Sequence, residues 1–210
     1  MELFVFQGNR GMGKTLGMVL YAKYLQEHTG CSLFSNFPMN GSDGFYSFDD
    51  FKKVATCENS ILLLDECHND LDGRDSQSRN VKYLTHMIFY LRKLRCTMLL
   101  TTPLFRSIAG QVRDVTNIVV CCSKNRDYFF YDFWDNDNSV FLKRRNINRE
   151  KALVLCDSVY DTKGIVSPLK FPEDRNGFVK LLEEIKQINE MHTYAYTLPG
   201  GEADGSSSWI

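Results

Sequence analysis

The sequence predicts an α/β fold: a central, mostly parallel sheet flanked by helices, with an antiparallel β extension and a C-terminal helix. Over residues 1–122, short apolar runs alternate with segments of helical periodicity, which is typical of parallel strands joined by crossover helices. After residue 122, strand-like segments follow one another across turns rich in Asn and Asp, and this change predicts antiparallel pairing. Apolar residues at helical spacing return over residues 175–191.

A glycine-rich segment between the first predicted strand, residues 3–6, and a helix reaching about residue 28 matches the pattern G-x-x-x-x-G-K-[ST]. In such a loop, backbone N–H groups converge on phosphates, the lysine adds a positive charge and the hydroxyl ligates Mg²⁺. The alternative is a glycine-rich turn with an incidental lysine. The residues expected to bind ATP are Gly8, Asn9, Arg10, Gly11, Met12, Gly13, Lys14 and Thr15.

Two carboxylates follow a second apolar run, residues 60–64, about fifty residues after this loop. A buried parallel strand would carry Asp65 and Glu66 to the carboxyl edge of the sheet, where open α/β sheets bind ligands. We expect Asp65 to hold Mg²⁺ together with Thr15, and Glu66 to orient or deprotonate an attacking water. This order of acids favours hydrolysis over transfer to a second substrate. On the alternative interpretation the two acids only cap a strand end.

The remaining elements follow from periodicity and turn residues. Strands are expected at residues 31–36, 97–102, 117–122, 128–134, 139–145 and 152–156, and helices at 48–54, 81–95, 105–112 and 175–191. Thr101 and Thr102 end one of these strands and are candidates for sensing the γ-phosphate, before Pro103 stops it. The polar, turn-rich residues 67–80 are expected to form a loop at the nucleotide edge.

The chain of 210 residues is long enough for one α/β domain. We expect a single domain over residues 1–197, with a nucleotide-binding core at 1–122, the antiparallel extension at 123–170 and the helix region at 171–197. Residues 198–210, rich in Gly and Ser and ending in Trp209 and Ile210, read as a flexible tail or as a segment that docks through those two side chains.

Charge and cysteine usage restrict the classes of partner and compartment. A formal net charge of −1 means that any nucleic-acid contact must come from local basic patches. The cluster Arg92, Lys93 and Arg95 suits either a helix C-terminus or DNA, and residues 143–145 suit either nucleic acid or protection of a strand edge. The seven cysteines lack metal-ligand spacing and we recognise no signal peptide, which together predict reduced thiols in a cytoplasm. No run of 18 apolar residues occurs, which predicts that the chain has no membrane span.

Together, the glycine-rich loop, the run at residues 65–69, the loop at 74–80 and the strand end at 101–103 resemble the small genome-packaging ATPases of viruses, in the FtsK/HerA group of P-loop proteins. The zonula occludens toxin-like phage assembly ATPases are close relatives of that group. Further matching details are residues 35–36, 113–117 and 160–162, so the resemblance covers roughly residues 1–170.

The resemblance implies a hexameric or pentameric ring that hydrolyses ATP at subunit interfaces and threads double-stranded DNA into a capsid, with capsid or portal proteins as partners. It implies a place in the host cytoplasm or at a packaging vertex of the virion. Carried over by position, Lys14 and Thr15 are Walker A residues, Asp65 and Glu66 are Walker B residues, and Arg79 or Arg113 is the arginine acting on a neighbouring subunit. Relatives often place a glutamine where this chain has Pro103, so the sensing role passes to Thr102.

Two other functions fit the same motifs. A phage assembly or secretion ATPase of the zonula occludens toxin-like type, including one that uses nucleotide only as a switch, is implied by the same resemblance. A nucleoside or nucleotide kinase has a similar length and loop, but it would need a nucleoside pocket and a lid. Phosphoryl transfer to a small acceptor distinguishes the kinase.

Overall fold

The computed structural model describes residues 2–67, 71, 78–161, 164 and 166–197. Eight strands of the described chain form one sheet: β1 (Leu3–Gln7), β2 (Ser32–Ser35), β3 (Asp43–Gly44), β4 (Ser60–Leu64), β5 (Cys96–Thr102), β6 (Ile118–Lys124), β7 (Tyr128–Asp135) and β8 (Val140–Asn148). The α-helices are α1 (Lys14–Thr29), α2 (Phe51–Ala55), α3 (Arg79–Tyr90), α4 (Gly110–Asp114), α5 (Arg149–Val159) and α6 (Arg175–Thr197). Short 3-10 helices occupy Phe48–Asp50 and Phe105–Ser107.

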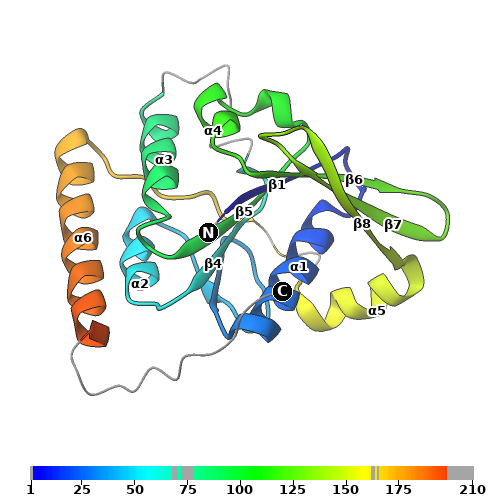
Figure 1. Ribbon diagram of the computed structural model, residues 1–210, viewed down its shortest axis with the longest axis horizontal. Coiled ribbons are helices and arrows are strands. Elements are labelled where there is room, and N and C mark those ends of the chain that lie inside the picture. The colour runs from blue at the N-terminus through cyan, green and yellow to red at the C-terminus, as the bar shows by residue number, and fades with distance from the viewer. Residues whose placement is uncertain (1, 68–70, 72–77, 162–163, 165, 198–210) are drawn as a thin grey trace.

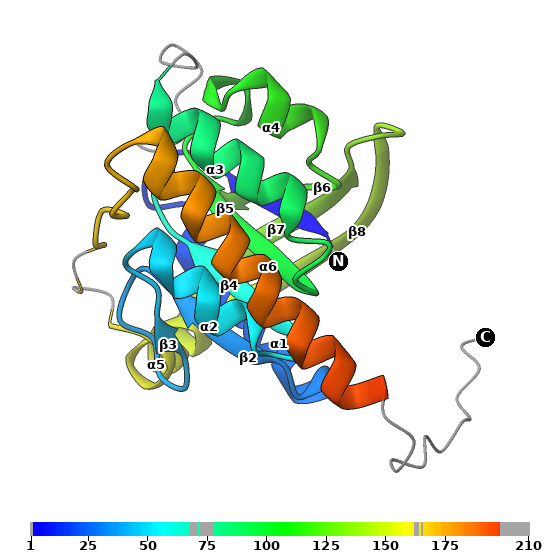
Figure 2. The same ribbon diagram turned by 90° about the vertical axis from the view of Figure 1, so that its left-hand side faces the viewer.

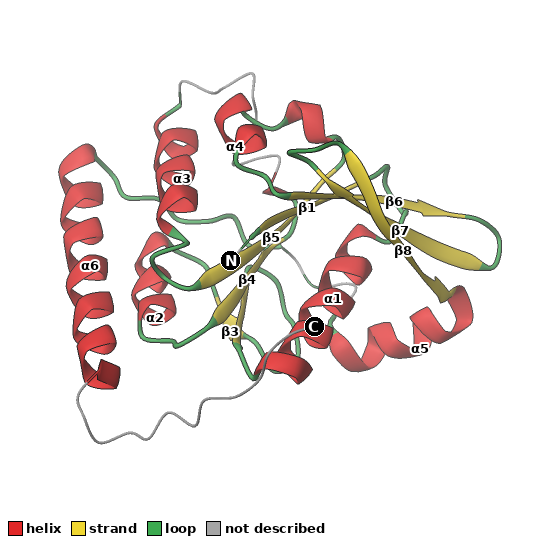
Figure 3. Cartoon of the chain, viewed as in Figure 1, coloured by secondary structure: helices red, strands yellow, loops and turns green. Residues whose placement is uncertain are grey.

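The strand order across the sheet is β3-β2-β4-β5-β1-β6-β7-β8. The strands from β3 to β6 run parallel, and β7 and β8 are added antiparallel at one side. The predicted α/β fold is therefore confirmed, including its antiparallel extension and C-terminal helix (Figures 1 and 3). Because β5 lies between β1 and β4, the ends of these three strands are neighbours at the carboxyl edge of the sheet.

Alternate residues of the parallel strands β1, β2, β4 and β5 pack into two different cores. On one face, Val5, Leu62 and Leu100 contact the cluster that includes residues of α2, α3, α4 and α6. On the other face, Phe6 and Leu63 belong to the cluster that contains the buried side of α1 and the aromatic residues of β7. Figure 2 shows α6 lying with α2 and α3 on the first face. Burial on both faces explains why the parallel strands read as continuous apolar runs.

The strand predicted at residues 152–156 is wrong, because this segment lies inside helix α5. Asn148 caps the helix by accepting hydrogen bonds from the N–H groups of Glu150 (2.9 Å) and Lys151 (3.4 Å). Ala152 and Cys156, four residues apart, face Leu16 of α1 in a small apolar cluster. The run of apolar letters suggested a strand, but contact with α1 selects the helical spacing.

Two predicted helices have different limits in the structure. The helix expected at 105–112 is split into the 3-10 turn at Phe105–Ser107 and helix α4. The helix expected at 81–95 begins at Arg79, with Ser78 as its cap, and ends at Tyr90. The basic cluster therefore lies in the turn after α3, where Arg95 donates hydrogen bonds to the Glu58 carbonyl oxygen and to Asn189 Oδ1.

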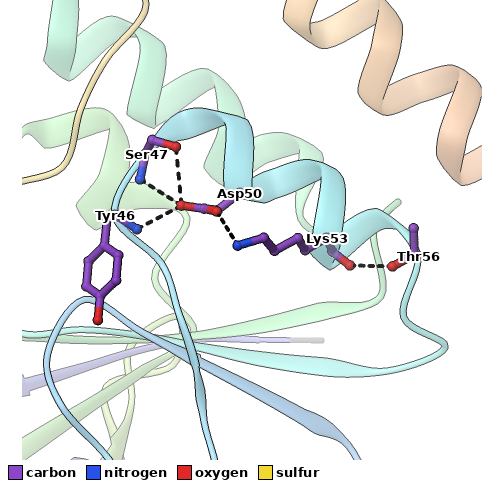
Figure 4. A network of polar contacts seen from close by, with 5 residues as sticks. All are labelled: Tyr46, Ser47, Asp50, Lys53 and Thr56. Carbon is purple, nitrogen blue, oxygen red and sulfur yellow. Dashed lines mark hydrogen bonds and ion pairs between the residues drawn. The ribbon is translucent and has the colours of Figure 1, made fainter.

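A polar network fixes the entry into α2 (Figure 4). Asp50 Oδ2 accepts hydrogen bonds from the N–H groups of Tyr46 and Ser47, both at 2.9 Å, and its Oδ1 lies 2.7 Å from Lys53 Nζ. Burial raises the pKa of Asp50, but the hydrogen bonds and the charge of Lys53 outweigh burial and leave the pKa below 3.8. Ser47 is the N-cap of the 3-10 turn at Phe48–Asp50, which leads into α2.

Some expectations fall on parts of the chain that the structure leaves undescribed. The tail at 198–210 and most of the polar loop at 67–80, namely 68–70 and 72–77, lie outside the described residues. Within the described helices, none combines the length and the hydropathy needed to cross a membrane.

Candidate nucleotide site

The glycine-rich loop connects β1 to α1, as the motif predicts. Gly13 is the N-cap of α1 with φ 77°, and a Cβ there would lie 2.8 Å from the ring of Phe129. Both the left-handed backbone and the close aromatic ring require glycine at this position. Lys14 Nζ lies 3.3 Å from the carbonyl oxygen of Asn9, so the ammonium group is held over the loop. The loop presents the start of α1, where N–H groups and the helix dipole favour anions.

The carboxylate of Asp65 is the centre of a polar cluster beside this loop. The hydroxyl of Thr15 donates to Asp65 at 2.9 Å (Oδ2) and 3.1 Å (Oδ1). From the intervening strand β5, Thr101 also donates its hydroxyl to Asp65 Oδ1. Asp65 is 9% exposed and Thr101 is 1% exposed. The strand order therefore brings Thr15 and Thr101 to the same carboxylate.

Asn36, at the end of β2, fixes the backbone of Asp65. Its amide nitrogen donates to the Asp65 carbonyl oxygen (3.1 Å), and its Oδ1 accepts from the Asp65 N–H group (2.8 Å). Asn36 is buried and follows the strand next to β4. A polar residue directly after an apolar run was the available signal, but it carries no information about strand order, so the sequence did not predict this contact.

Glu66 leaves the sheet edge in a different direction from Asp65. Its backbone has φ 55°, which is uncommon for a residue other than glycine. Its N–H group donates to Thr101 Oγ1 at 2.9 Å, and its side chain is exposed. Thr101 thus contacts both acidic residues, through the side chain of one and the backbone of the other.

Three predicted site residues lie away from this cluster. Thr102 is fully buried, and its hydroxyl pairs with the backbone of Leu104. Arg79 begins α3 and donates to the Glu173 carbonyl oxygen just before α6. Arg113 lies in α4, and its Nε is buried without a hydrogen-bond partner among the described residues. The structure therefore places Thr101, and not Thr102, next to Asp65, because successive strand residues point to opposite faces.

Tyr131, in the antiparallel extension, contacts the glycine-rich loop. Its hydroxyl donates to the Gly13 carbonyl oxygen at 3.1 Å, and its ring lies directly against Gly17 of α1. Burial raises the pKa of Tyr131 far above its usual range, so the hydroxyl keeps its proton and stays a donor. The sequence did not predict this contact, because it depends on how β7 curves over α1.

The oxygen atoms at this edge suit a magnesium ion. Asp65 offers a carboxylate, and Thr15 offers a hydroxyl within hydrogen-bond distance of it. Mg²⁺ prefers such oxygen ligands and keeps several waters. Among the described residues, no group of three or more His, Cys, Asp or Glu side chains is placed to hold a metal. The prediction of a magnesium ion therefore depends on the pair Thr15 and Asp65.

The order of these strands, with the phosphate-type loop after β1 and the acid after β4, defines the P-loop NTPase fold. Within that class, the chain belongs to the Zonular occludens toxin (Zot) family, whose sequence profile matches residues 39–149. This confirms the expected relationship to the zonula occludens toxin-like proteins. A search of curated protein sequences gives no match.

Solved structures of viral NTPases share the fold. The genome packaging NTPase B204 from Sulfolobus turreted icosahedral virus 2, in complex with ATP-gammaS, matches with a TM-score of 0.51 at 12% identity, covering 69% of this chain and 96% of that chain. The DNA-packaging ATPase B204 from Sulfolobus Turreted Icosahedral Virus matches with a TM-score of 0.52 at 12% identity and the same coverage, 69% and 96%. The N-terminal domain of zonular occludens toxin from Neisseria meningitidis covers 85% of this chain and 97% of its own, with 13% identity and a TM-score of 0.48.

Proposed function

We propose that the chain binds ATP with Mg²⁺ and hydrolyses it. The observation that carries the proposal is the contact of Asp65 with Thr15 at 2.9 Å, beside the glycine-rich loop. A glycine-rich loop that only bound an anion would not need the carboxylate of Asp65, at the end of β4, against its threonine. The fold that the chain shares with NTPases is consistent with this activity.

Each residue has a distinct part in the proposed reaction. The N–H groups of residues 8–15 and the ammonium group of Lys14 bind the phosphates. Thr15 and Asp65 would hold Mg²⁺, which neutralises charge on the phosphate oxygens. Glu66, exposed at the sheet edge, orients or deprotonates the attacking water. Thr101 fixes both acids and is a positioning residue.

An arginine from a neighbouring subunit would complete the site. Such a residue contributes about 10³ to 10⁵ in rate in comparable enzymes. The candidates are Arg79 and Arg113, neither of which contacts Asp65 or the glycine-rich loop within its own chain through any hydrogen bond of the described residues. Mixing Arg79→Ala or Arg113→Ala subunits with Lys14→Ala subunits should restore some active interfaces. Failure of both mixtures would remove these arginines from the role.

The test of the hydrolytic role is Glu66→Gln. The amide keeps the size of the side chain but cannot act as a base, so ATP should still bind while turnover falls by about 10² to 10⁴. Binding is measured with a fluorescent ATP analogue and turnover by phosphate release, with Glu58→Gln as the surface control. Full turnover in Glu66→Gln would exclude Glu66 as the group that activates water.

For the cargo, we propose that hydrolysis in a ring of subunits moves double-stranded DNA into a viral capsid, with capsid or portal proteins as partners. The functions of the structural neighbours, genome packaging and DNA packaging, support this proposal only through the shared fold. The corresponding place of action is the host cytoplasm or the packaging vertex of the virion. The family match favours the alternative that the ATPase serves phage assembly or secretion.

One experiment addresses the cargo and the assembly together. ATP turnover is measured with and without double-stranded DNA, and the mass of the assembly is measured in solution. The packaging proposal requires faster turnover with DNA and a mass of several subunits. A monomer that hydrolyses ATP but is indifferent to DNA would contradict packaging and would leave the phage assembly function. Phosphoryl transfer to a nucleoside, with little hydrolysis, would instead indicate a kinase.

A further inference from the structure

A second cavity lies on the far side of α1 from the nucleotide cluster. It has a volume of about 300 Å³, at the lower end of the range for small-ligand sites. Its lining on α1 comes from Gly17, Leu20, Tyr21 and Tyr24. At about 100° per residue, these positions fall roughly opposite Thr15 on the helix. The cavity is therefore separate from the side of α1 that contacts Asp65.

The walls of this cavity are mainly apolar. Across from α1, the rings of Tyr131 and Phe133 on β7 and the side chain of Ile147 on β8 close the space. Burial has the largest effect on the pKa of Tyr21 and, together with the charge of Glu2, raises it to about 12. The charge of Arg145 lowers this pKa, but by a smaller amount. The hydroxyl of Tyr21 is therefore neutral at physiological pH. An occupant must bury an apolar body against these walls.

The rim of the cavity carries two positive charges. Lys143 and Arg145, two residues apart on β8, line the same space, and no Asp or Glu is among the residues that line it. Lys143 Nζ lies 5.1 Å from the ring centre of Phe133 and 5.8 Å from that of Tyr21. Among the described residues neither cation forms an ion pair, whereas Arg144, between them, is bound to Asp132 at 2.5 Å on the other face of the strand.

We propose that this cavity binds a small amphipathic anion, with a single aliphatic chain against the aromatic walls and a carboxylate between Lys143 and Arg145. The apolar walls match the chain, and the two cations, which form no ion pair with any described residue, match the charge. A volume of about 300 Å³ accommodates one short chain and is too small to enclose both chains of a two-chain lipid. The site does not depend on the proposed ATPase function.

The position of Tyr131 links this cavity to the glycine-rich loop. The ring of Tyr131 lines the cavity, and its hydroxyl holds the Gly13 carbonyl oxygen. A ligand that alters this hydrogen bond changes the affinity of the loop for nucleotide, and nucleotide then changes the affinity for the ligand by the same factor. This linkage rests on nucleotide binding at the loop, whereas occupancy of the cavity does not.

The probe for the site is decanoate, with 1-decanol as the neutral counterpart, titrated calorimetrically into the full chain. Decanoate should bind, and the Lys143→Gln/Arg145→Gln double variant should bind it at least about tenfold more weakly. The matched control is Lys180→Gln/Lys186→Gln on α6, at exposed positions on the opposite face of the sheet. Equal binding of decanol, or unchanged affinity in the Lys143/Arg145 variant, would overturn the proposal.

Two further measurements locate the ligand. Leu20→Trp should fill the cavity and abolish decanoate binding. Circular dichroism melting establishes whether this variant is folded. If it is not folded, the Lys143→Gln/Arg145→Gln variant provides the test. Lys14→Ala, which weakens nucleotide binding, should leave decanoate affinity unchanged. Loss of decanoate binding in Lys14→Ala, or its full displacement by ATP, would make the cavity part of the nucleotide site and refute a separate site. An absence of ATP turnover alongside intact decanoate binding would count only against the ATPase function.

Discussion

Asp65 has more hydrogen-bond donors around it than a metal ligand alone requires. Its carboxylate accepts from the hydroxyls of Thr15 and Thr101, and its backbone is paired at both polar groups with Asn36. A buried carboxylate needs such donors to offset its lost hydration. The donors also fix the orientation of the side chain, which the proposed ion shared with Thr15 would require.

Replacing Thr101 tests this positioning. Thr101→Val keeps the shape of the side chain but removes the donor to Asp65 and the acceptor for the Glu66 N–H group. Loss of such a supporting partner typically costs about 10- to 100-fold in metal affinity or activity. We expect a fall of that size in turnover and a higher Mg²⁺ concentration for half-maximal rate, measured by titrating Mg²⁺ at saturating ATP.

The neighbouring residue provides the control. Thr102→Val makes the same chemical change at the next residue, whose hydroxyl pairs, among the described residues, only with the backbone of Leu104. It should leave the Mg²⁺ dependence unchanged. If both variants, or neither, shift the Mg²⁺ requirement, Thr101 has no special role at the site.

At this scale the sequence predicted the residues of contiguous motifs, but not the contacts that depend on strand order. The spacing of Gly8, Lys14 and Thr15 is a local property of the chain, and Asp65 follows a recognisable buried strand. Asn36 and Thr101 reach Asp65 only because β2 and β5 are the two neighbours of β4. No local pattern encodes that adjacency.

Among the elements, strand β7 contacts helix α1 directly beside the loop, through Tyr131. A Cβ on Gly17 would lie 2.2 Å from Cε1 of Tyr131. A glycine at this helical position is unfavourable by propensity, by about 1 kcal/mol relative to Ala. It is required here because the tyrosine ring occupies the space where a side chain would lie.

Gly17→Ala should therefore destabilise the protein despite the better helix propensity of alanine. The added methyl group must displace the Tyr131 ring, and overpacking of this kind typically costs about 1 to 3 kcal/mol. Urea unfolding gives the free energy. The control is Gly110→Ala in α4, where the nearest atom to an added Cβ lies 3.7 Å away. Equal stability changes in the two variants would contradict the steric role of Tyr131.

The network at the start of α2 predicts a dependence of stability on pH. The folded-state pKa of Asp50 is lowered, so its stabilising contribution is present above the unfolded value near 3.8 and is lost as pH falls through the folded value. Asp50→Asn should lower stability at pH 7 by about 1 kcal/mol. The difference from the unsubstituted protein should shrink below about pH 4.

A neighbouring acid controls for the loss of charge. Asp49 is 73% exposed and makes only an ion pair with Lys52 at 3.0 Å, so Asp49→Asn should change stability by less than Asp50→Asn at pH 7. Thermal unfolding over pH 3 to 7, in steps of about one unit, compares the two. A difference for Asp50→Asn that persists unchanged at the acidic end would show that its carboxylate charge is not the cause.

The contrast between α5 and the parallel strands shows which elements could be predicted. The strands buried on both faces were predicted correctly, because short, wholly apolar runs between turns are typical of strands that are covered on both faces. Residues 152–156 were equally apolar, yet Leu153 is 67% exposed and Val154 is 74% exposed in helix α5. Where apolar residues remain at the surface, the burial argument behind a strand prediction fails.

Over the whole molecule, the nucleotide site lies where several layers meet. The loop joins β1, whose residues enter both cores, to α1, which is packed between the parallel sheet and the antiparallel extension. The class of fold followed from the order of elements in the sequence. The closure of β7 over α1 did not, because the curvature of the sheet arises from pairing between distant strands.

A ligand bound at this junction should stabilise the whole fold. Binding to the native state alone adds about 2.7 kcal/mol when the ligand is at 100 times its Kd. We expect ATP with Mg²⁺ to raise the melting temperature by several degrees, and chelation of the metal to reduce this shift, because Thr15 and Asp65 then lose the ion that they share. Lys14→Ala should abolish the shift, whereas Lys180→Ala on α6 should retain it. Since α1 contacts both the parallel strands and β7, the stabilisation should appear as one cooperative transition. If ATP raised the melting temperature of only a minor, separate transition, the antiparallel extension and the nucleotide core would unfold independently.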